Sequence, residues 1–312
     1  MPANVGFAIL SYNEPAQLLS LVRTLNAMFG APSIVCHHNF SQCKLDDTLY
    51  PSNVQFVRPH IRTRWGHITT VLAALRAFDL LQNGHRRPDW YVLLSGSDYP
   101  VRPADKIISE LSSNEYDVYL DHREIIYGTI PPNQTAQDGG FGRESWIQLA
   151  YDRYCAFRFW WPRYSSELLN SRPFFPFRRE HVCIRNPRVL RWIPWDRPTR
   201  IYGGRFWLQA NNKAIERLLR NSRMQSLVRY YRRRPIPEES LLHTMLCSQP
   251  DLRICKDSKR YEDWTGGTAH PEWLTVADVP KIIRSGAHFA RKFHPNGDAQ
   301  GFINERVLKI SP

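Results

Sequence analysis

The hydrophobic and polar positions of the first 120 residues alternate between two patterns. Short apolar runs predict strands buried on both faces, at residues 4–11, 33–37, 54–57, 89–94 and 117–120. Between them, apolar residues recur at helical spacing, which predicts helices at residues 14–29, 68–83 and 103–112. Gly30 follows the first helix and can end it in the left-handed conformation.

This alternation of strand and helix predicts an α/β fold with a mostly parallel sheet. Right-handed crossovers place the helices on both faces of such a sheet. Ligands then bind where the carboxyl ends of the strands meet. The segments that leave those ends are polar, at residues 11–13, 37–39 and 95–98. We therefore expect a binding site at this edge of the sheet.

The pattern loosens beyond about residue 125. Residues 126–142 are rich in Pro, Gly, Asn and Gln and predict a long loop, and residues 160–200 combine prolines with aromatic residues. Regular structure returns at residues 213–219, 238–247 and 276–285. Because no internal repeat is present, we expect one mixed domain over residues 1–312, with a basic, loop-rich insertion.

The composition is that of a globular protein, with 42% hydrophobic and 23% charged residues. It excludes disordered, collagen-like and coiled-coil chains. The longest apolar runs fall far short of the roughly 20 residues that a membrane helix needs, and no signal peptide is recognisable, so we expect a soluble protein. The six cysteines form no C-x-x-C pair, which favours free thiols in a reducing compartment.

Positive charge is concentrated in one third of the chain. Residues 153–234 hold 20 basic residues against four acidic ones, whereas the whole chain carries +13. Most of these basic residues are arginines interleaved with aromatic residues. Such a surface suits an anionic partner that carries rings, whether a glycan, a lipid headgroup or a nucleic acid. The alternative is that the aromatic residues fill a core while the arginines are merely solvated.

Several enzyme classes lack their motifs in this chain. Neither glycine-rich phosphate loop is present, and there is no G-x-S-x-G elbow or H-E-x-x-H zinc helix. A nucleotide-sugar transferase remains open, because it needs a nucleotide-binding sheet, positive charge at the departing diphosphate, and a carboxylate that takes a proton. The chain has no Asp-x-Asp pair to hold a metal ion, and only Asp98 follows the strand at 89–94. Basic side chains would then have to replace the metal ion.

Five motif blocks occur in order along the chain. They are Trp65-Gly66-His67, residues 94–102 (LSGSDYPVR), residues 203–207 (GGRFW), residues 237–244 (PEESLLHT), and His270-Pro271 with residues 289–293 (FARKF). Together they resemble the core-2/I-branching β-1,6-N-acetylglucosaminyltransferases and the related peptide O-xylosyltransferases. The resemblance spans roughly residues 5–293. It implies a GT-A-type fold, a UDP-sugar donor, inversion at the anomeric carbon and no requirement for a divalent metal.

The resemblance also implies which residues act. Glu239 matches the catalytic base, while Glu238 is expected to stabilise the first turn of the helix that Pro237 opens. Arg291 and Lys292 match the basic pair that neutralises the diphosphate of the leaving UDP. Acidic first turns are common in helices, however, and a basic pair between two phenylalanines can equally be a solvated turn. The residues therefore leave both alternatives open.

The other expected contacts fall at the two ends of the donor. Residues expected to bind the UDP portion are Ser11, His38, Asn39, Trp65 and Ser97. Residues expected at the donor sugar or the acceptor are Asp98, Gly204, Arg205, Trp207 and Trp264. An Asp after a strand often only forms a turn, and a Trp more often fills the core. Residues 1–125 would form the nucleotide-binding half, and residues 126–312 the acceptor-binding and catalytic half.

We therefore expect a transferase that moves GlcNAc from UDP to a saccharide or lipid-linked glycan. A UDP-xylose- or UDP-glucuronate-dependent enzyme is the alternative, because the motifs lie near the phosphates and not near the substituent at C5 of the sugar. From another class, the basic stretch suits a nucleic-acid-binding protein whose affinity falls steeply with salt. Family members in secretory compartments carry an anchor and many disulfides. Their absence here predicts a bacterial, cytoplasmic enzyme, with residues 153–234 available to contact an anionic inner membrane.

Overall fold

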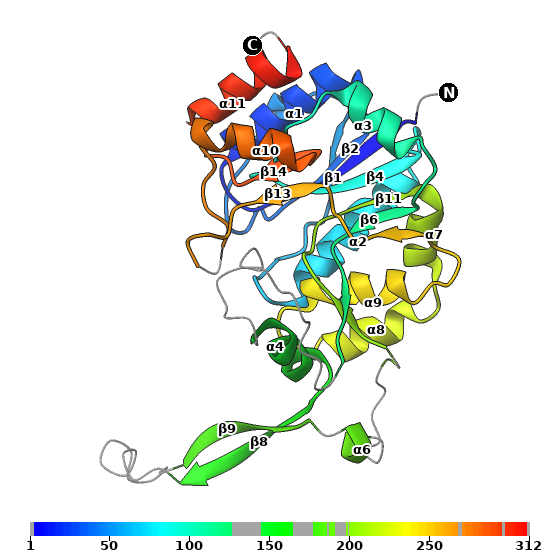
Figure 1. Cartoon of the computed structure of the whole chain (residues 1–312), viewed down its shortest axis with the longest axis vertical. Coiled ribbons are helices and arrows are strands. Elements are labelled where there is room, and N and C mark those ends of the chain that lie inside the picture. Colours follow the sequence, from blue (N-terminus) through cyan, green and yellow to red (C-terminus); the bar gives the residue numbers. More distant parts are fainter. Residues whose placement is uncertain are drawn as a thin grey trace.

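The computed structural model describes residues 3–126, 145–164, 177–185, 187–190, 198, 200–267, 270–294 and 297–310. Its centre is a seven-stranded sheet in the order β12-β6-β11-β4-β1-β2-β3 (Figure 1). The strands are β1 (Val5–Ser11), β2 (Ile34–His38), β3 (Val54–Phe56), β4 (Trp90–Ser95), β6 (Val118–Leu120), β11 (Leu208–Asn211) and β12 (Ile254–Cys255). Neighbours are parallel except at β11, which is antiparallel to β4 and to β6. The predicted α/β fold with a mostly parallel sheet is confirmed.

Helices cover both faces of this sheet (Figure 1). One face carries α1 (Pro15–Phe29), α3 (Ala104–Leu111), α10 (Val279–Ser285) and α11 (Asp298–Ile303). The other carries α2 (Ile68–Gln82), α4 (Ser145–Tyr154), α7 (Asn212–Arg220), α8 (Met224–Tyr231) and α9 (Leu241–Cys247). Each set of helices therefore closes its own hydrophobic core.

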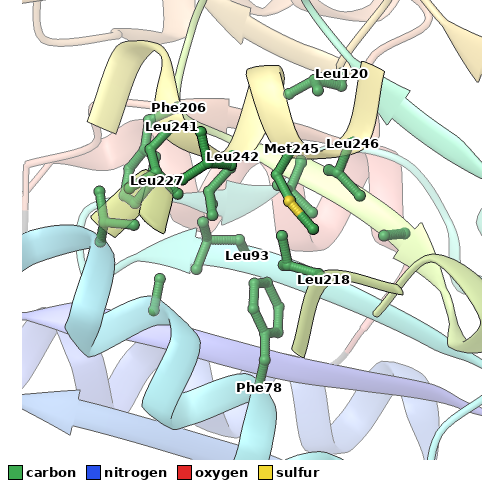
Figure 2. Packing of buried hydrophobic residues seen from close by; sticks show 14 of the residues in the cluster. Phe78, Leu93, Leu120, Phe206, Leu218, Leu227, Leu241, Leu242, Met245 and Leu246 are labelled. Atoms are coloured by element: carbon green, nitrogen blue, oxygen red, sulfur yellow. The ribbon is translucent and has the colours of Figure 1, made fainter. Parts of the chain in front are cut away.

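The strands supply both cores by alternation, because successive side chains point to opposite faces. In β1, Phe7 belongs to the core under α1, whereas Ala8 belongs to the core under α2, and both are 0% exposed. Figure 2 shows Leu93 of β4 between Phe78 of α2 and Met245 of α9. Burial of each large apolar side chain contributes about 1.5–3 kcal/mol. The two cores together hold the strands in place, and with them the carboxyl edge of the sheet at which residues 11–13, 37–39 and 95–98 lie.

The predicted elements of the first 120 residues are all present, with boundaries that differ by one or two residues. Gly30 ends α1 in the left-handed conformation, with φ of 65°, as expected. The element predicted at 238–247 is two elements, the 3-10 turn η2 (Pro237–Glu239) and α9, which Ser240 separates. The helix predicted at 276–285 likewise begins with a 3-10 turn, η3 (Val276–Asp278).

Shorter strands form three smaller sheets. They are β5 (Tyr99–Pro100) with β14 (Phe289–Arg291) and β13 (Arg260–Glu262), β7 (Arg123–Glu124) with β10 (Tyr202–Gly203), and β8 (Phe157–Tyr164) with β9 (Phe177–Ile184). The remaining short elements are η1 (Asp47–Leu49), α6 (Pro187–Leu190) and the π-helical turn η4 (Asn304–Leu308). The β13-β14-β5 sheet brings residues near the C-terminus against the segment that follows β4.

The basic third of the chain is described only in part. The hairpin β8–β9 projects from the body of the molecule, and the sequence pattern did not predict it (Figure 1). The loop predicted at 126–142 lies outside the described residues except for Ile126, and so do residues 165–176 and 191–197 of the insertion. Cys36, Cys43, Cys247 and Cys255 form no disulfide. In the part of the chain that the structure describes, no helix is both long and apolar enough to cross a bilayer.

Candidate functional site

Residues at the ends of three strands meet at one edge of the sheet. The backbone N–H of Asn39, after β2, donates to the carbonyl of Ser11 at the end of β1 (2.9 Å). A Cβ atom on Gly96, after β4, would lie 3.0 Å from the Cβ of Ser11. The expected neighbourhood of residues 11, 39 and 96–98 is therefore present.

A hydrogen-bond chain fixes the state of His38. Its Nε2 lies 2.8 Å from the carbonyl of Cys43 and donates to it, so Nδ1 accepts from the Ser11 hydroxyl at 2.8 Å. Burial lowers the pKa of His38, which keeps the ring neutral. Ser11 and His38 thus form a rigid, uncharged wall of the site.

Asn39 presents a polar atom that no group in the described part of the chain satisfies. Its amide nitrogen donates to the carbonyl and hydroxyl oxygens of Thr63, both at 3.1 Å, and to the side chain of Gln42. Its side-chain oxygen is buried and has no hydrogen-bond partner among the residues that the structure describes. Buried acceptors are nearly always paired, so this oxygen is available to a donor group on a ligand.

Glu239 is a partly exposed carboxylate with a perturbed pKa. Its Oε2 lies 3.1 Å from Nη1 of Arg153 on α4, and its side chain is 34% exposed. Desolvation raises the pKa of Glu239 to about 7, Arg153 opposes the rise, and the charges of Glu238 and Glu262 add to it. A carboxyl group that titrates near neutral pH can exchange a proton readily with a bound hydroxyl.

Glu238 joins the Trp65-Gly66-His67 block to this region. Its Oε1 accepts the backbone N–H of Gly66 (3.0 Å), and Ile236 donates to the carbonyl of Gly66 (3.0 Å). Glu238 lies in the first turn of η2, which Pro237 opens, as expected, and its carboxylate also bonds to a loop 172 residues earlier. Trp65, beside Gly66, is 67% exposed and meets the ring of His270 edge-on at 6.4 Å.

A buried ion pair lies behind the segment that follows β4. Oδ1 of Asp98 is 2.6 Å from Nη1 of Arg260, and both side chains are 0% exposed. The other carboxylate oxygen of Asp98 accepts the backbone N–H of Ser95, and Arg260 donates to the carbonyl of Leu93 (2.8 Å). Nε of Arg291 is 3.9 Å from Asp98. Asp98 is thus engaged by protein groups on both oxygens.

A second buried carboxylate, Glu262 on β13, joins several predicted site residues. Its side chain is 1% exposed, and its Oε1 accepts from Arg291 at 3.2 Å. Its Oε2 lies 3.4 Å from Arg205 and 3.4 Å from the indole nitrogen of Trp264. The ring of Trp207, 9% exposed, lies 4.6 Å from the guanidinium carbon of Arg291. Arg205, Arg291, Trp207 and Trp264 therefore belong to one cluster.

Lys292 lies beside Arg291. Its ammonium group is 5.7 Å from the ring of Trp273, and its pKa is lowered by desolvation and by the charge of Arg291. Phe289 and Phe293 are both buried, and Arg291 is only 14% exposed at the end of β14, so the Arg291 side chain is not a solvated turn residue. The backbone N–H of Phe293 donates to the carbonyl of Ser97 (3.1 Å), which ties the basic pair to the segment after β4.

Close backbone approach explains the two adjacent glycines. A Cβ on Gly204 would lie 2.2 Å from the carbonyl oxygen of Asp121, a distance that real side chains do not reach. The backbone N–H of Gly204 donates to the carbonyl of Glu239 (2.9 Å), and that of Arg205 donates to the carboxylate of Asp121 (3.2 Å). Gly204 thus lets the segment that carries Arg205 lie directly against Asp121.

Sequence reasoning missed three residues of this site, namely Arg153, Arg260 and Glu262. A signal existed for two of them, since charges at positions 260 and 262 share one face of a strand. Arg153 had no signal beyond the excess of basic residues.

Within the described ranges, no three His, Cys, Asp or Glu side chains are grouped so as to hold a metal ion. Independence of a metal stays a prediction.

The fold and site define an α/β protein in which guanidinium groups and a carboxylate of raised pKa meet at the carboxyl edge of the sheet. Residues 5–128 and 179–284 match the model of the Core-2/I-Branching enzymes, and the chain belongs to that family.

Two individual proteins are also similar. The Beta-glucuronosyltransferase GlcAT14A of Arabidopsis thaliana is 24% identical over 257 residues, which cover 78% of this chain. The chain spans about half of that relative, 48% of its length. A solved apo structure of the WbbM bifunctional glycosyltransferase aligns with 98% of this chain and 52% of its own, at 11% identity and a TM-score of 0.37. That likeness is too low to support an argument.

Proposed function

We propose that this chain is an inverting, metal-independent glycosyltransferase that moves a sugar from a UDP-sugar to a hydroxyl group of a saccharide. The observation that carries the proposal is that the carboxyl of Glu239, whose pKa burial raises to about 7, is influenced by the charge of Glu262, which also pairs with Arg291 and acts on Lys292. Membership of the Core-2/I-Branching enzyme family supports the assignment as a glycosyltransferase.

Glu239 acts as the general base. It takes the proton of the acceptor hydroxyl while the hydroxyl oxygen forms a bond to the anomeric carbon of the donor. The bond from that carbon to the phosphate oxygen breaks on the opposite face, and its electron pair leaves with UDP. A base with a pKa near the working pH combines a large deprotonated fraction with sufficient basicity. One carboxylate therefore suffices.

Arg291 and Lys292 neutralise the charge that develops on the diphosphate. Guanidinium groups bridge two phosphate oxygens, and an ammonium group adds a compact charge. Asp98 supports this assignment, because Arg260 and the Ser95 N–H occupy its carboxylate, which leaves it poorly suited to hold a metal ion. Asp98, itself paired with Arg260, also attracts Arg291 at 3.9 Å.

The remaining predicted residues divide between the two substrates. The UDP portion lies along the edge formed by Ser11, His38, Asn39, Ser97 and Trp65, where the unpaired oxygen of Asn39 can accept an N–H of the base. The donor sugar and the acceptor lie near Asp98, Gly204, Arg205, Trp207 and Trp264. Residues 1–125 thus serve mainly the nucleotide, and residues 126–312 serve the acceptor and the chemistry.

The transferred sugar is GlcNAc in the first form of the proposal. The likeness to the plant beta-glucuronosyltransferase favours a second candidate, glucuronate, and xylose is the third. The acceptor is a saccharide or lipid-linked glycan, which the basic region 153–234 could meet at an anionic membrane surface. A nucleic-acid-binding protein is the alternative from another class, and it predicts no UDP binding.

The test measures UDP release from UDP-GlcNAc, UDP-glucuronate and UDP-xylose, with a panel of saccharide acceptors, with and without a chelator. We expect one donor to turn over, with a rate that the chelator leaves unchanged. Glu239→Gln should lose about 100-fold or more, in line with general-base contributions. Strong inhibition by the chelator would contradict the metal-free mechanism, and a near-normal rate in the variant would exclude Glu239 as the base.

A further inference from the structure

Glu262 lies where the two sides of the proposed site meet. In the parallel pair β13–β14 it is the register partner of Arg291, and β14 in turn pairs with β5, directly after Asp98. Its two oxygens face different groups, with Arg291 on one and Arg205 and Trp264 on the other. Under the proposed function, the first group contacts the leaving diphosphate and the second contacts the acceptor.

We propose that Glu262 is a positioning residue that fixes the acceptor-binding groups relative to the groups that hold the diphosphate. This inference rests on the proposed function. Glu262 touches neither substrate, since its side chain is 1% exposed beneath the guanidinium groups. It acts through Arg205 and Arg291, whose charged ends it holds on either side of one carboxylate.

The charge balance of the cluster shows why one carboxylate matters. Three guanidinium groups, those of Arg205, Arg260 and Arg291, share Asp98 and Glu262 as buried acidic partners. Without the charge of Glu262, the three cations repel one another with less compensation. Arg291 still has Asp98 at 3.9 Å and is 14% exposed. Arg205 is the more exposed of the two, at 29%, so it is the group that shifts toward water.

The deciding variant is Glu262→Gln, which keeps the shape and removes the charge. We expect the KM for the saccharide acceptor to rise about tenfold, the scale of one hydrogen bond to a charged group. The Kd for UDP, measured by titration calorimetry, should not rise, because the site becomes more positive around Arg291. Asp263→Asn is the matched control, since the side chain of that neighbouring acid accepts two hydrogen bonds from Thr265 in the turn that follows. It should leave both constants unchanged.

A pH profile separates positioning from a purely structural effect. The negative charge of Glu262 helps to raise the pKa of Glu239, so its removal should move the acidic limb of the rate profile to lower pH. Glu262→Asp keeps the charge and should keep the limb near its wild-type position. A variant that is merely less well folded would have a lower reaction rate, but the acidic limb of its pH profile would stay at the same pH.

A second variant tests the same inference in case Glu262→Gln folds poorly. Arg205→Gln should raise the acceptor KM to a similar extent, and the double variant should add little, because both changes break one contact. An unchanged acceptor KM in an active Glu262→Gln enzyme, additive effects in the double variant, or an equal loss of UDP affinity would overturn the inference alone. Wild-type protein that binds no UDP and turns over no UDP-sugar would overturn the proposed function itself.

Discussion

The arginines of this chain occur in two very different surroundings. At the carboxyl edge of the sheet, Arg260 and Arg291 are 0% and 14% exposed, and each faces a buried carboxylate. Along α7, α8 and the turn that follows, the arginines are exposed to solvent, at positions 217, 220, 223, 229, 232 and 233. In that second region the described acidic partner is Asp251, itself 39% exposed.

The comparison shows that the density of positive charge along the sequence does not locate the candidate site. The exposed arginines contribute to the high net charge of the basic third, but water already solvates them and salt screens them. The buried arginines add little to the net charge because acids pair with them. Their cost of desolvation is offset only in a fixed geometry, and under the proposed function that geometry suits Arg291 to hold a diphosphate.

The largest difference between the two regions should appear in stability. Asp98→Asn leaves Arg260 charged and buried, which should lower the free energy of unfolding by about 3–5 kcal/mol. Asp251→Asn removes partners from the exposed Arg217 and Lys213 and should cost less than about 1 kcal/mol. Urea unfolding followed by circular dichroism measures both. Similar losses in the two variants would show that burial does not distinguish the two regions.

The next difference should appear in nucleotide affinity. Arg291→Gln removes a charged donor from the proposed diphosphate site and should weaken UDP binding about 10- to 100-fold, the equivalent of about 1.5–3 kcal/mol. Arg220→Gln on the exposed end of α7 is the matched control and should leave the Kd within error. Titration calorimetry at two salt concentrations measures both. Equal weakening by the two changes would favour nonspecific charge attraction over a defined site.

The smallest difference concerns pH. Rate should rise as pH increases through about 7, because Glu239 must lose its proton before it can act as a base. Arg153 lowers that pKa, so Arg153→Gln should move the acidic limb to higher pH, by about one pH unit at most. This is the direction opposite to that expected for Glu262→Gln. Arg223→Gln should leave the profile in place, and a limb that stays fixed in Arg153→Gln would contradict the pairing with Glu239.

The first half of the fold was predictable because each strand and helix there carries its own pattern. β11 was not, since it is a four-residue strand whose buried Gln209 bonds to Ser258 and His288. A polar residue in a buried strand becomes acceptable only through partners that the chain supplies elsewhere, and no local pattern contains them.

The site was predictable to a similar extent. The Pro237-Glu238-Glu239 block alone did not separate a base from an acidic helix start, and the resemblance to a family selected Glu239. The buried charges of Arg260 and Glu262 escaped notice because their partners lie far away in sequence, Asp98 among them. A charged residue normally indicates surface, and only the folded chain shows that these two are covered.

The place of β11 has a consequence for how the chain can be divided. This strand lies between β4 and β6, so a late stretch of sequence completes a sheet whose other central strands are made early. A fragment that stopped before residue 200 would lack both β11 and β12, which would leave one edge of β4 and both edges of β6 unpaired and would favour aggregation. Recombination or truncation at the middle of the chain should therefore yield no stable nucleotide-binding module. The early strands and the later strand β11 must therefore be present in one chain for the sheet to fold.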